Sequence, residues 1–176
     1  MHTIPELILA RATHYVKRLE CGLTGVLGHG DQGVVFVKAP LSTHGRFSHP
    51  TALKVLLHEA DYSRERDVYL RLRERDIEFI GDCAVPTLIA YDDTLCAIEM
   101  DIVEEPCIID FASAYLDVPE EYASDLLDLG RSKGAEIFGA AWPIVQALLT
   151  ELTSHGIYLT DLSPGNIRIH DTRMIR

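Results

Sequence analysis

Apolar residues recur at helical spacing near the start of the chain, which predicts an amphipathic helix. Thr3 and Glu6 form a capping box around Pro5 at its beginning. Glu6 and Arg11 interrupt the apolar run, so we expect neither a signal peptide nor a membrane span. The apolar face of this predicted helix consists of Ile4, Leu7, Ile8, Ala12, Tyr15, Val16 and Leu19.

The pattern changes from helix to strand after this segment. Gly28, Gly30 and Gly33 precede the β-branched and aromatic run 34–37, which predicts a strand, a glycine turn and a second strand. A dinucleotide-binding site has the same glycine spacing but places a helix directly after the glycines. The strand pattern therefore disfavours a dinucleotide site.

Three more strands are predicted before residue 104. The strand at 51–56 carries Lys54 as a single charge among apolar neighbours. Two further strands, at 85–91 and 95–103, are predicted around a turn at 92–94. A charge such as that of Lys54 in apolar surroundings needs a partner or a ligand.

The expected partner of Lys54 is a glutamate on the helix predicted at 57–73. Glu65 has apolar residues at i+3, i+4 and i+7, which places it on the inward face, whereas Glu59 lies on the solvated face. In an isolated helix, pairing of Glu65 with neighbouring arginines on the surface would be the favoured alternative. Beside the glycine segment and Lys54, we favour the ion pair with Lys54.

A second helical pattern ends at 155–156 and leads directly into a polar loop. The loop contains Asp161 and Asn166, and this pair suits a site in which one acceptor reaches a substrate hydroxyl and another oxygen reaches a magnesium ion. An ordinary turn is the alternative, because the polar residues of 161–166 are all turn formers. The helix pattern consists of Ala141, Ile144, Val145, Leu148, Leu149 and Leu152.

Three segments, in this order, resemble motifs of the protein kinase-like superfamily over roughly residues 23–169. Residues 28–35 fit the glycine-loop pattern G-x-G-x-x-G-x-V, which ends here at Val35. Lys54 resembles the phosphate-binding lysine, and residues 161–166 resemble the end of the catalytic loop H-R-D-L-x-x-x-N. As the third motif in sequence, the loop is better explained by this resemblance than by an ordinary turn.

The resemblance implies a role for each of these residues. Lys54 and Glu65 would position the phosphates of ATP under the glycine loop, Asp161 would act as the catalytic base, and Asn166 would bind Mg²⁺. In the family, the hinge backbone hydrogen-bonds adenine, and this contact would involve the segment that begins at Met100. The register stays open because Glu99 and Asp101 could each occupy the usual acidic position. The hinge residues implied by the resemblance are Met100, Asp101 and Ile102.

Several positions depart from the family pattern. Leu159 and Thr160 replace the usual histidine and arginine, so we do not expect activation by a phosphorylated loop that docks on that arginine. Ser163 replaces the usual lysine, which resembles Rio-type and other atypical kinases. Asp171 follows Asn166 too closely to be the D-F-G-type metal ligand. We expect it to be the turn residue of a short hairpin at the end of the chain.

The resemblance implies an α+β fold of the protein kinase type. Residues 1–103 would form an antiparallel small-lobe sheet with a regulatory helix, and the N-terminal helix would pack on it. Residues 104–176 would form the hinge and a truncated helical large lobe. Because later helices of that lobe are missing, the apolar face around Leu148 needs another cover. We expect a homo-oligomer, a partner protein or a continuation of the polypeptide.

Composition narrows the set of partners and compartments. A hydrophobic content of 47% supports a packed core, and the net charge of -11 opposes general binding to nucleic acid or an anionic membrane surface and favours a basic partner. The cysteines are widely spaced and mostly lie in apolar surroundings, which predicts free thiols in a reducing compartment and a cytoplasmic protein. They are Cys21, Cys83, Cys96 and Cys107.

The sequence therefore predicts an ATP- and Mg²⁺-dependent phosphotransferase, with a protein serine or threonine as the favoured acceptor. Two alternatives stay open. The first is a pseudokinase or nucleotide-binding interaction module that lacks the second metal ligand. The second is a small-molecule kinase similar to the aminoglycoside type, which Ser163 permits.

Overall fold

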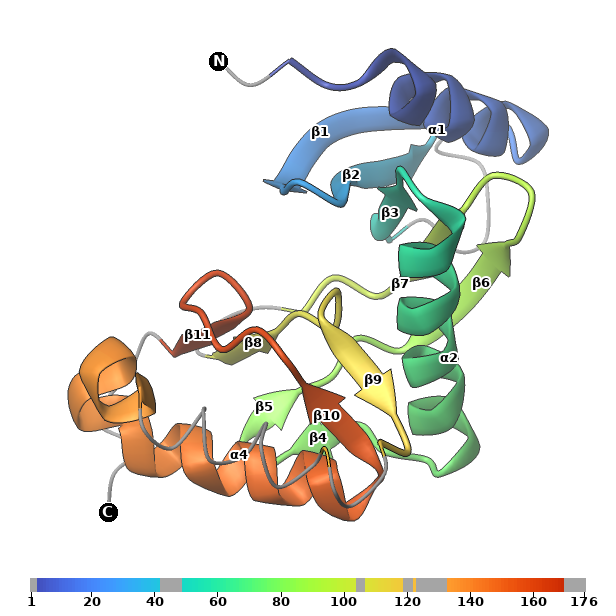
Figure 1. Ribbon diagram of the computed structural model, residues 1–176. Helices are drawn as coiled ribbons and strands as arrows, with labels where there is room; N and C mark the ends of the chain where they lie inside the picture. The colour runs from blue at the N-terminus through green and yellow to red at the C-terminus, as the bar shows by residue number, and fades with distance from the viewer. Residues whose placement is uncertain (1–2, 42–48, 104–106, 119–121, 123–132, 170–176) are drawn as a thin grey trace. The chain divides into compact units, whose positions relative to one another are not determined.

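The computed structural model divides into two compact units, each containing both strands and helices, so the predicted α+β class is confirmed (Figure 1). No helix in the described part of the chain combines the length and the apolar content that crossing a bilayer requires. The described residues are 3–41, 49–103, 107–118, 122 and 133–169. The first unit comprises Met1–Arg66 and Pro86–Ile102, and the second comprises Asp67–Val85 and Val103–Arg176.

The first unit is built on a five-stranded antiparallel sheet in the order β1-β2-β3-β7-β6. The sequence predicts a glycine turn between two strands and a later hairpin around 92–94, and the structure confirms both. The β-branched and aromatic residues in these segments favour the extended conformation. The strands are β1 (Cys21–His29), β2 (Gly33–Pro40), β3 (Thr51–Leu56), β6 (Leu88–Asp92) and β7 (Ala97–Met100).

Helix α1 (Glu6–Arg18) packs on one face of this sheet (Figure 1). The predicted capping box does not form: Pro5 is the N-cap, and Thr3 lies two residues too early to accept from the first turn. Leu7 and Leu19 are about half exposed, because Leu7 points away from the sheet and Leu19 follows the last helical residue. The core between helix and sheet consists mainly of Ile8, Ala12, Tyr15, Val16, Val34, Phe36, Leu53, Val55 and Ala97.

Helix α2 (Glu59–Glu74) follows β3 and closely matches the helix predicted at 57–73. Glu65 is fully buried and Glu59 is exposed, as the spacing of apolar residues predicts. A buried acid on this helix needs a partner of opposite charge or hydrogen-bond donors. The apolar residues that share its inward face, Val68, Tyr69 and Leu72, are buried as well.

The second unit combines helix α4 with two-stranded antiparallel ladders. β8 pairs with β11 and β9 pairs with β10, so a strand holds the chain on each side of residues 161–166. Residues 170–176 of the predicted terminal hairpin, including Asp171, lie outside the described residues. The elements are β4 (Phe79–Ile80), β5 (Cys83–Ala84), β8 (Cys107–Ile109), β9 (Ala114–Leu116), the 3-10 helix η1 (Gly139–Ala141), α4 (Trp142–Ser154), β10 (Ile157–Leu159) and β11 (Ile167–Ile169).

Helix α4 buries the apolar face that the sequence predicts for it. Val145, Leu148 and Leu152 are at most 2% exposed, and the helix packs against β4 and β10. Gly81, with a φ of 56°, turns the chain so close to the helix that a Cβ there would lie 2.9 Å from Leu148 Cδ2. Its amide donates to Glu151 Oε2 at 2.7 Å. The expectation of an uncovered apolar face around Leu148 is therefore wrong, because elements of the same chain cover it.

We expect Leu148→Ala to lower the free energy of unfolding by about 3 kcal/mol, since it removes buried methyl groups and leaves a cavity. Gln146→Ala changes an exposed position of the same helix and should shift stability by less than about 0.5 kcal/mol. Urea unfolding of both variants and the wild type measures the difference. Equal stability of the three proteins would contradict the burial of Leu148.

A disulfide joins β5 to β8 in the second unit. Cys83 and Cys107 are both buried, and their Cα atoms lie 5.0 Å apart. The prediction of free thiols is therefore wrong for this pair, because the fold brings together two cysteines that are 24 residues apart in sequence. Cys21 and Cys96 carry free thiols. The cysteines thus give no support to a reducing compartment, and a cytoplasmic location stays a prediction.

Candidate functional site

The predicted ion pair between Lys54 and Glu65 is confirmed. Lys54 Nζ on β3 lies 2.6 Å from Glu65 Oε1 on α2. Lys54 is 6% exposed and Glu65 is 0% exposed, so both charges are largely removed from water. Such a pair persists only with close geometry, because desolvation of the two charges is costly.

The strand register places Lys54 and Gly28 of the glycine loop in one row of directly paired residues across the sheet. Gly28 is paired with Val35, Val35 with Lys54, and Lys54 with Ile98 across four neighbouring strands. Directly paired residues of antiparallel strands share a face of the sheet. The core under α1 is formed by the alternate positions, such as Leu53. The row of Lys54 therefore lies on the face opposite α1.

The glycines of the loop differ in what the fold requires of them. A Cβ at Gly33 would lie 2.6 Å from Val55 O, so the fold itself requires glycine there. A Cβ at Gly28 would approach Val35 Cγ2 only to 3.9 Å, and one at Gly30 would meet nothing within 4 Å. Gly28 and Gly30 also lack a positive φ. Packing within the chain thus gives no reason for the missing side chains at these two positions.

The two acids considered for the hinge have different environments. Glu99 lies within β7, paired with Leu53 on one side and Ala90 on the other. Its buried carboxylate accepts from Tyr15 Oη at 2.9 Å and from Thr51 Oγ1 at 2.8 Å, and it pairs with Lys38. Glu99 is therefore a structural residue of the sheet.

Tyr15, which donates to Glu99, keeps its proton. Burial raises the pKa of the Tyr15 hydroxyl, and the neighbouring carboxylate of Glu99 raises it further. The hydroxyl therefore stays a hydrogen-bond donor at neutral pH. Asp101, by contrast, follows the end of β7, and its amide donates to Thr87 O at 3.1 Å.

Asp161 and Asn166 come together in the loop between β10 and β11. Asn166 Nδ2 donates to the carbonyl oxygen of Asp161 at 3.0 Å and to Asp161 Oδ2 at 2.9 Å. Backbone amides of Asn166 and Ile167 both donate to Ser163 O at 3.0 Å. The loop is thus a hydrogen-bonded turn that also fixes the side chain of Asn166 against an exposed Asp161.

Residues between β8 and β9 anchor both ends of this loop. Thr160 donates to Ser113 O from its amide at 3.1 Å and from its hydroxyl at 2.9 Å, and Asp110 N donates to Asn166 O at 2.7 Å. The sequence gives no signal for these anchors, because Thr160 and Ser113 are 47 positions apart and neither lies in a recognisable local pattern.

The structure therefore brings together Lys54 with Glu65 and Asp161 with Asn166. The first pair, the glycines and the segment Met100 to Ile102 belong to the first unit, and the second pair belongs to the second unit. Among the described residues, no three carboxylate, imidazole or thiolate groups lie close enough to hold a metal ion.

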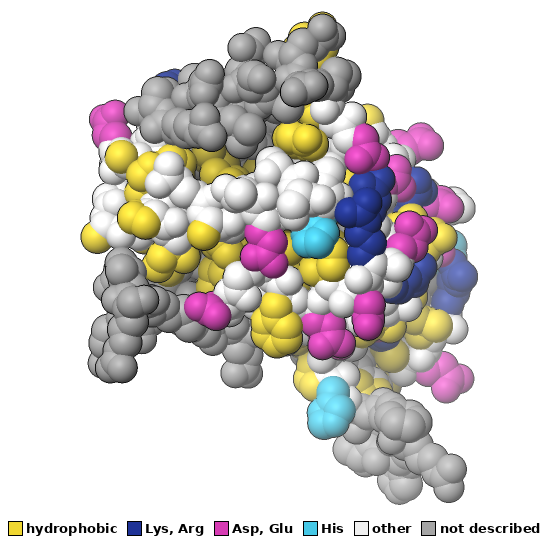
Figure 2. Space-filling view, turned by 90° about the horizontal axis from the view of Figure 1, so that it is seen from below, with side chains coloured by type: hydrophobic (Ala, Val, Ile, Leu, Met, Phe, Trp, Pro, Cys, Tyr) yellow, Lys and Arg dark blue, Asp and Glu magenta, His cyan; other side chains and the backbone are white. Residues whose placement is uncertain are grey.

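Several charged side chains outside these two pairs form ion pairs at the protein surface. The face in Figure 2 shows basic side chains next to acidic ones. In the second unit, Arg71 donates to both carboxylate oxygens of Asp117 at 2.6 and 3.1 Å, which lowers the pKa of Asp117. Such pairing supports local structure, and exposed pairs of this kind contribute little to stability.

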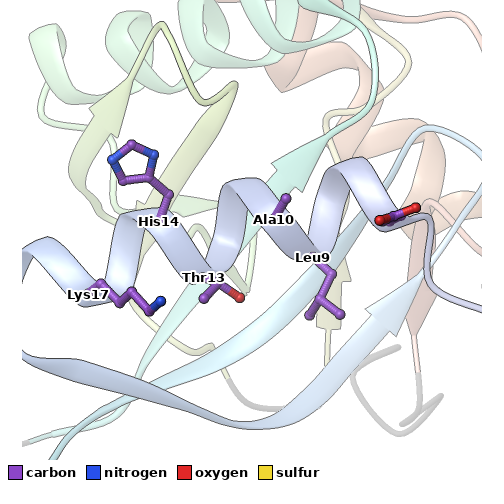
Figure 3. Close-up of a pocket in the computed structure, with 6 residues that line it drawn as sticks. Leu9, Ala10, Thr13, His14 and Lys17 are labelled. Atoms are coloured by element: carbon purple, nitrogen blue, oxygen red, sulfur yellow. The ribbon is translucent and has the colours of Figure 1, made fainter.

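A depression on the outer side of α1 contains none of the predicted site residues. Leu9, Thr13, His14 and Lys17 point outward from the helix around it (Figure 3). Because its lining comes from a single helix, the depression is open and offers no converging polar groups. We assign it no function.

Comparison of the chain with protein-family models and with curated proteins finds no match. The resemblance to the protein kinase-like superfamily consequently depends on the residues quoted above.

Proposed function

We propose that the chain has a kinase-like fold, binds ATP through its first unit and transfers the γ-phosphoryl group to a protein serine or threonine. The observation that carries this proposal is the buried Lys54–Glu65 pair, whose lysine lies in one row of the sheet with Gly28 of the glycine loop. The fold would tolerate a side chain at Gly28 and at Gly30, yet neither position has one. Close approach of phosphate oxygens to the backbone would explain their absence.

Lys54 supplies the positive charge for the phosphates in this proposal. Glu65 holds Lys54 Nζ in place, so little reorganisation is needed when an anion binds. Val35, next to Lys54 in the row, provides an apolar surface for the nucleotide. The site thus combines a fixed cation, an apolar wall and exposed glycine backbone.

The adenine ring would contact Met100, Asp101 and Ile102. Glu99 is paired within the sheet on both sides, whereas the chain leaves β7 after Met100. The Asp101 amide is engaged with Thr87 O, so a ligand would use the carbonyl oxygen of Asp101, which lies beyond the paired strand. We therefore assign the acidic hinge position to Asp101. This assignment is part of the proposal.

Asp161 would accept the proton of the attacking hydroxyl. The oxygen–phosphorus bond to the acceptor forms as the bond between the γ-phosphorus and the oxygen that leaves with ADP breaks. Bound Mg²⁺ would neutralise the developing charge on the phosphates. Asn166 fits this ion, because its Nδ2 is engaged with Asp161 and its carboxamide oxygen is the atom type that Mg²⁺ prefers.

Two other functions are compatible with the same nucleotide site, and the first is that of a pseudokinase. An interaction module of this kind would bind nucleotide without transferring phosphate. A small-molecule kinase would instead transfer phosphate to a hydroxyl outside a polypeptide.

We expect the wild-type chain to bind ATP in isothermal titration calorimetry with Mg²⁺, and Gly30→Val to weaken binding by at least about tenfold. The variant should keep the melting temperature, because nothing lies within 4 Å of a Cβ at Gly30. Gly33→Ala is the matched contrast: its Cβ would meet Val55 O, so it should lose stability. A folded wild type that binds no ATP at millimolar concentration would refute the nucleotide site.

A further inference from the structure

The turn between β6 and β7 holds helix α2 through one aspartate. Tyr62 Oη donates to Asp93 Oδ1 at 2.8 Å, and Arg66 Nη1 lies 2.6 Å from the same oxygen. The Arg66 guanidinium also lies over the rings of Tyr62, at 5.4 Å, and Tyr91, at 5.9 Å. These contacts involve neither the glycine loop nor Lys54.

The spacing on α2 links this contact to the buried ion pair. Tyr62 and Arg66 are four residues apart and therefore lie one turn apart on the same side of the helix. Glu65 lies between them in sequence, three residues after Tyr62. A rotation of α2 by about 30° would move a carboxylate at the helix surface by about 3 Å, given a helix radius with side chains of about 5–6 Å. That displacement would break the contact of Glu65 with Lys54.

We propose that Asp93 is a positioning residue that fixes the rotation of α2 and thereby keeps Glu65 on Lys54. The consequence for phosphoryl transfer rests on the proposed function. The positioning itself does not.

Among these contacts, the hydrogen bond from Tyr62 should matter most. Asp93 is 64% exposed, so its ion pair with Arg66 is screened by water. Tyr62 is 1% exposed, and a buried hydroxyl without an acceptor is costly. Burial is the largest cause that raises the pKa of Tyr62, and the hydrogen bond to Asp93 raises it further. The bonds from Tyr62 and Arg66 lower the pKa of Asp93. The pair therefore stays a neutral donor and an ionised acceptor.

Helix α1 contacts both the turn between β6 and β7 and the connection from β3 to α2. Arg18 Nη1 lies 2.6 Å from Asp92 Oδ2, next to Asp93 in the turn. Arg11 Nη1 donates to Leu56 O at 2.7 Å and to Leu57 O at 3.0 Å, at the connection from β3 to α2. The turn that carries Asp93 is thus anchored on the side away from α2.

Hydrogen exchange tests the positioning without any ligand. In Asp93→Ala, the amides of residues 62–66 should exchange about tenfold faster than in the wild type. Tyr62→Phe should show a smaller increase, because it removes the hydroxyl itself and leaves no buried donor without an acceptor. Thr94→Ala, at an exposed site in the same turn, should match the wild type. Unchanged exchange of residues 62–66 in a folded Asp93→Ala would overturn the proposal.

Kinetics test the consequence for the reaction. Asp93→Ala should lower kcat for phosphoryl transfer about tenfold with little change in the KM for ATP, because a displaced Glu65 affects the transition state more than binding. Asp93→Asn should restore most of the rate, since its amide oxygen can still accept from Tyr62. If Asp93→Ala showed faster hydrogen exchange but an unchanged kcat, the proposed role of Asp93 in phosphoryl transfer would be wrong. A wild type without transfer would instead refute the proposed function, and exchange would still decide the positioning.

Discussion

Asp161→Asn is expected to slow phosphoryl transfer by about 10²- to 10⁴-fold, because the amide cannot accept the proton of the attacking hydroxyl. The loop should keep its geometry, since an amide oxygen at this position can still accept from Asn166 Nδ2. ATP affinity should therefore stay within a factor of about two of the wild type.

Transfer of radiolabelled γ-phosphate to a panel of protein acceptors, in single turnover with saturating ATP, measures this effect. Arg168→Gln, an exposed charge change on the adjoining strand β11, is the matched control and should leave the rate unchanged. Full activity of Asp161→Asn would show that Asp161 is not the base. If the wild type bound ATP but transferred phosphate to no protein, a panel of small-molecule acceptors would be tested next. Transfer to one of them would indicate a small-molecule kinase, and no transfer would indicate a pseudokinase.

Lys54→Met is expected to have two large effects, one on the reaction and one on stability. Loss of the cation aimed at the phosphates should lower kcat/KM for ATP by about 10²- to 10³-fold. Removal of one partner of a buried ion pair should also lower the free energy of unfolding by about 3–5 kcal/mol. Urea unfolding and steady-state kinetics measure the two effects separately.

The double variant Lys54→Met with Glu65→Leu separates charge from folding. Both charges are replaced by apolar groups of similar size, which is often neutral or stabilising for a buried pair. We therefore expect stability close to the wild type but no recovery of transfer. Recovery of activity in the double variant would mean that Lys54 acts only through the fold and does not bind phosphate.

The sequence by itself determined the elements whose signals are local. The apolar runs of β2 and β3, the turn around Asp93 and the apolar spacing after Glu65 each lie within a few residues, so they predict the sheet segments and the inward face of α2. The Lys54–Glu65 pair was predicted from the inward position of Glu65 together with its context beside the glycine segment, because a single charge in an apolar strand needs a partner.

Only the tertiary structure decided the features that depend on distant residues. The bond between Cys83 and Cys107, the cover over Leu148 and the anchoring of Thr160 on Ser113 each join segments without any matching pattern in the sequence. Apolar spacing on α4 predicts that Leu148 is buried but does not say against what. Burial of Leu148 requires a second surface that packs against α4. Which strands provide that surface depends on the packing of the whole chain.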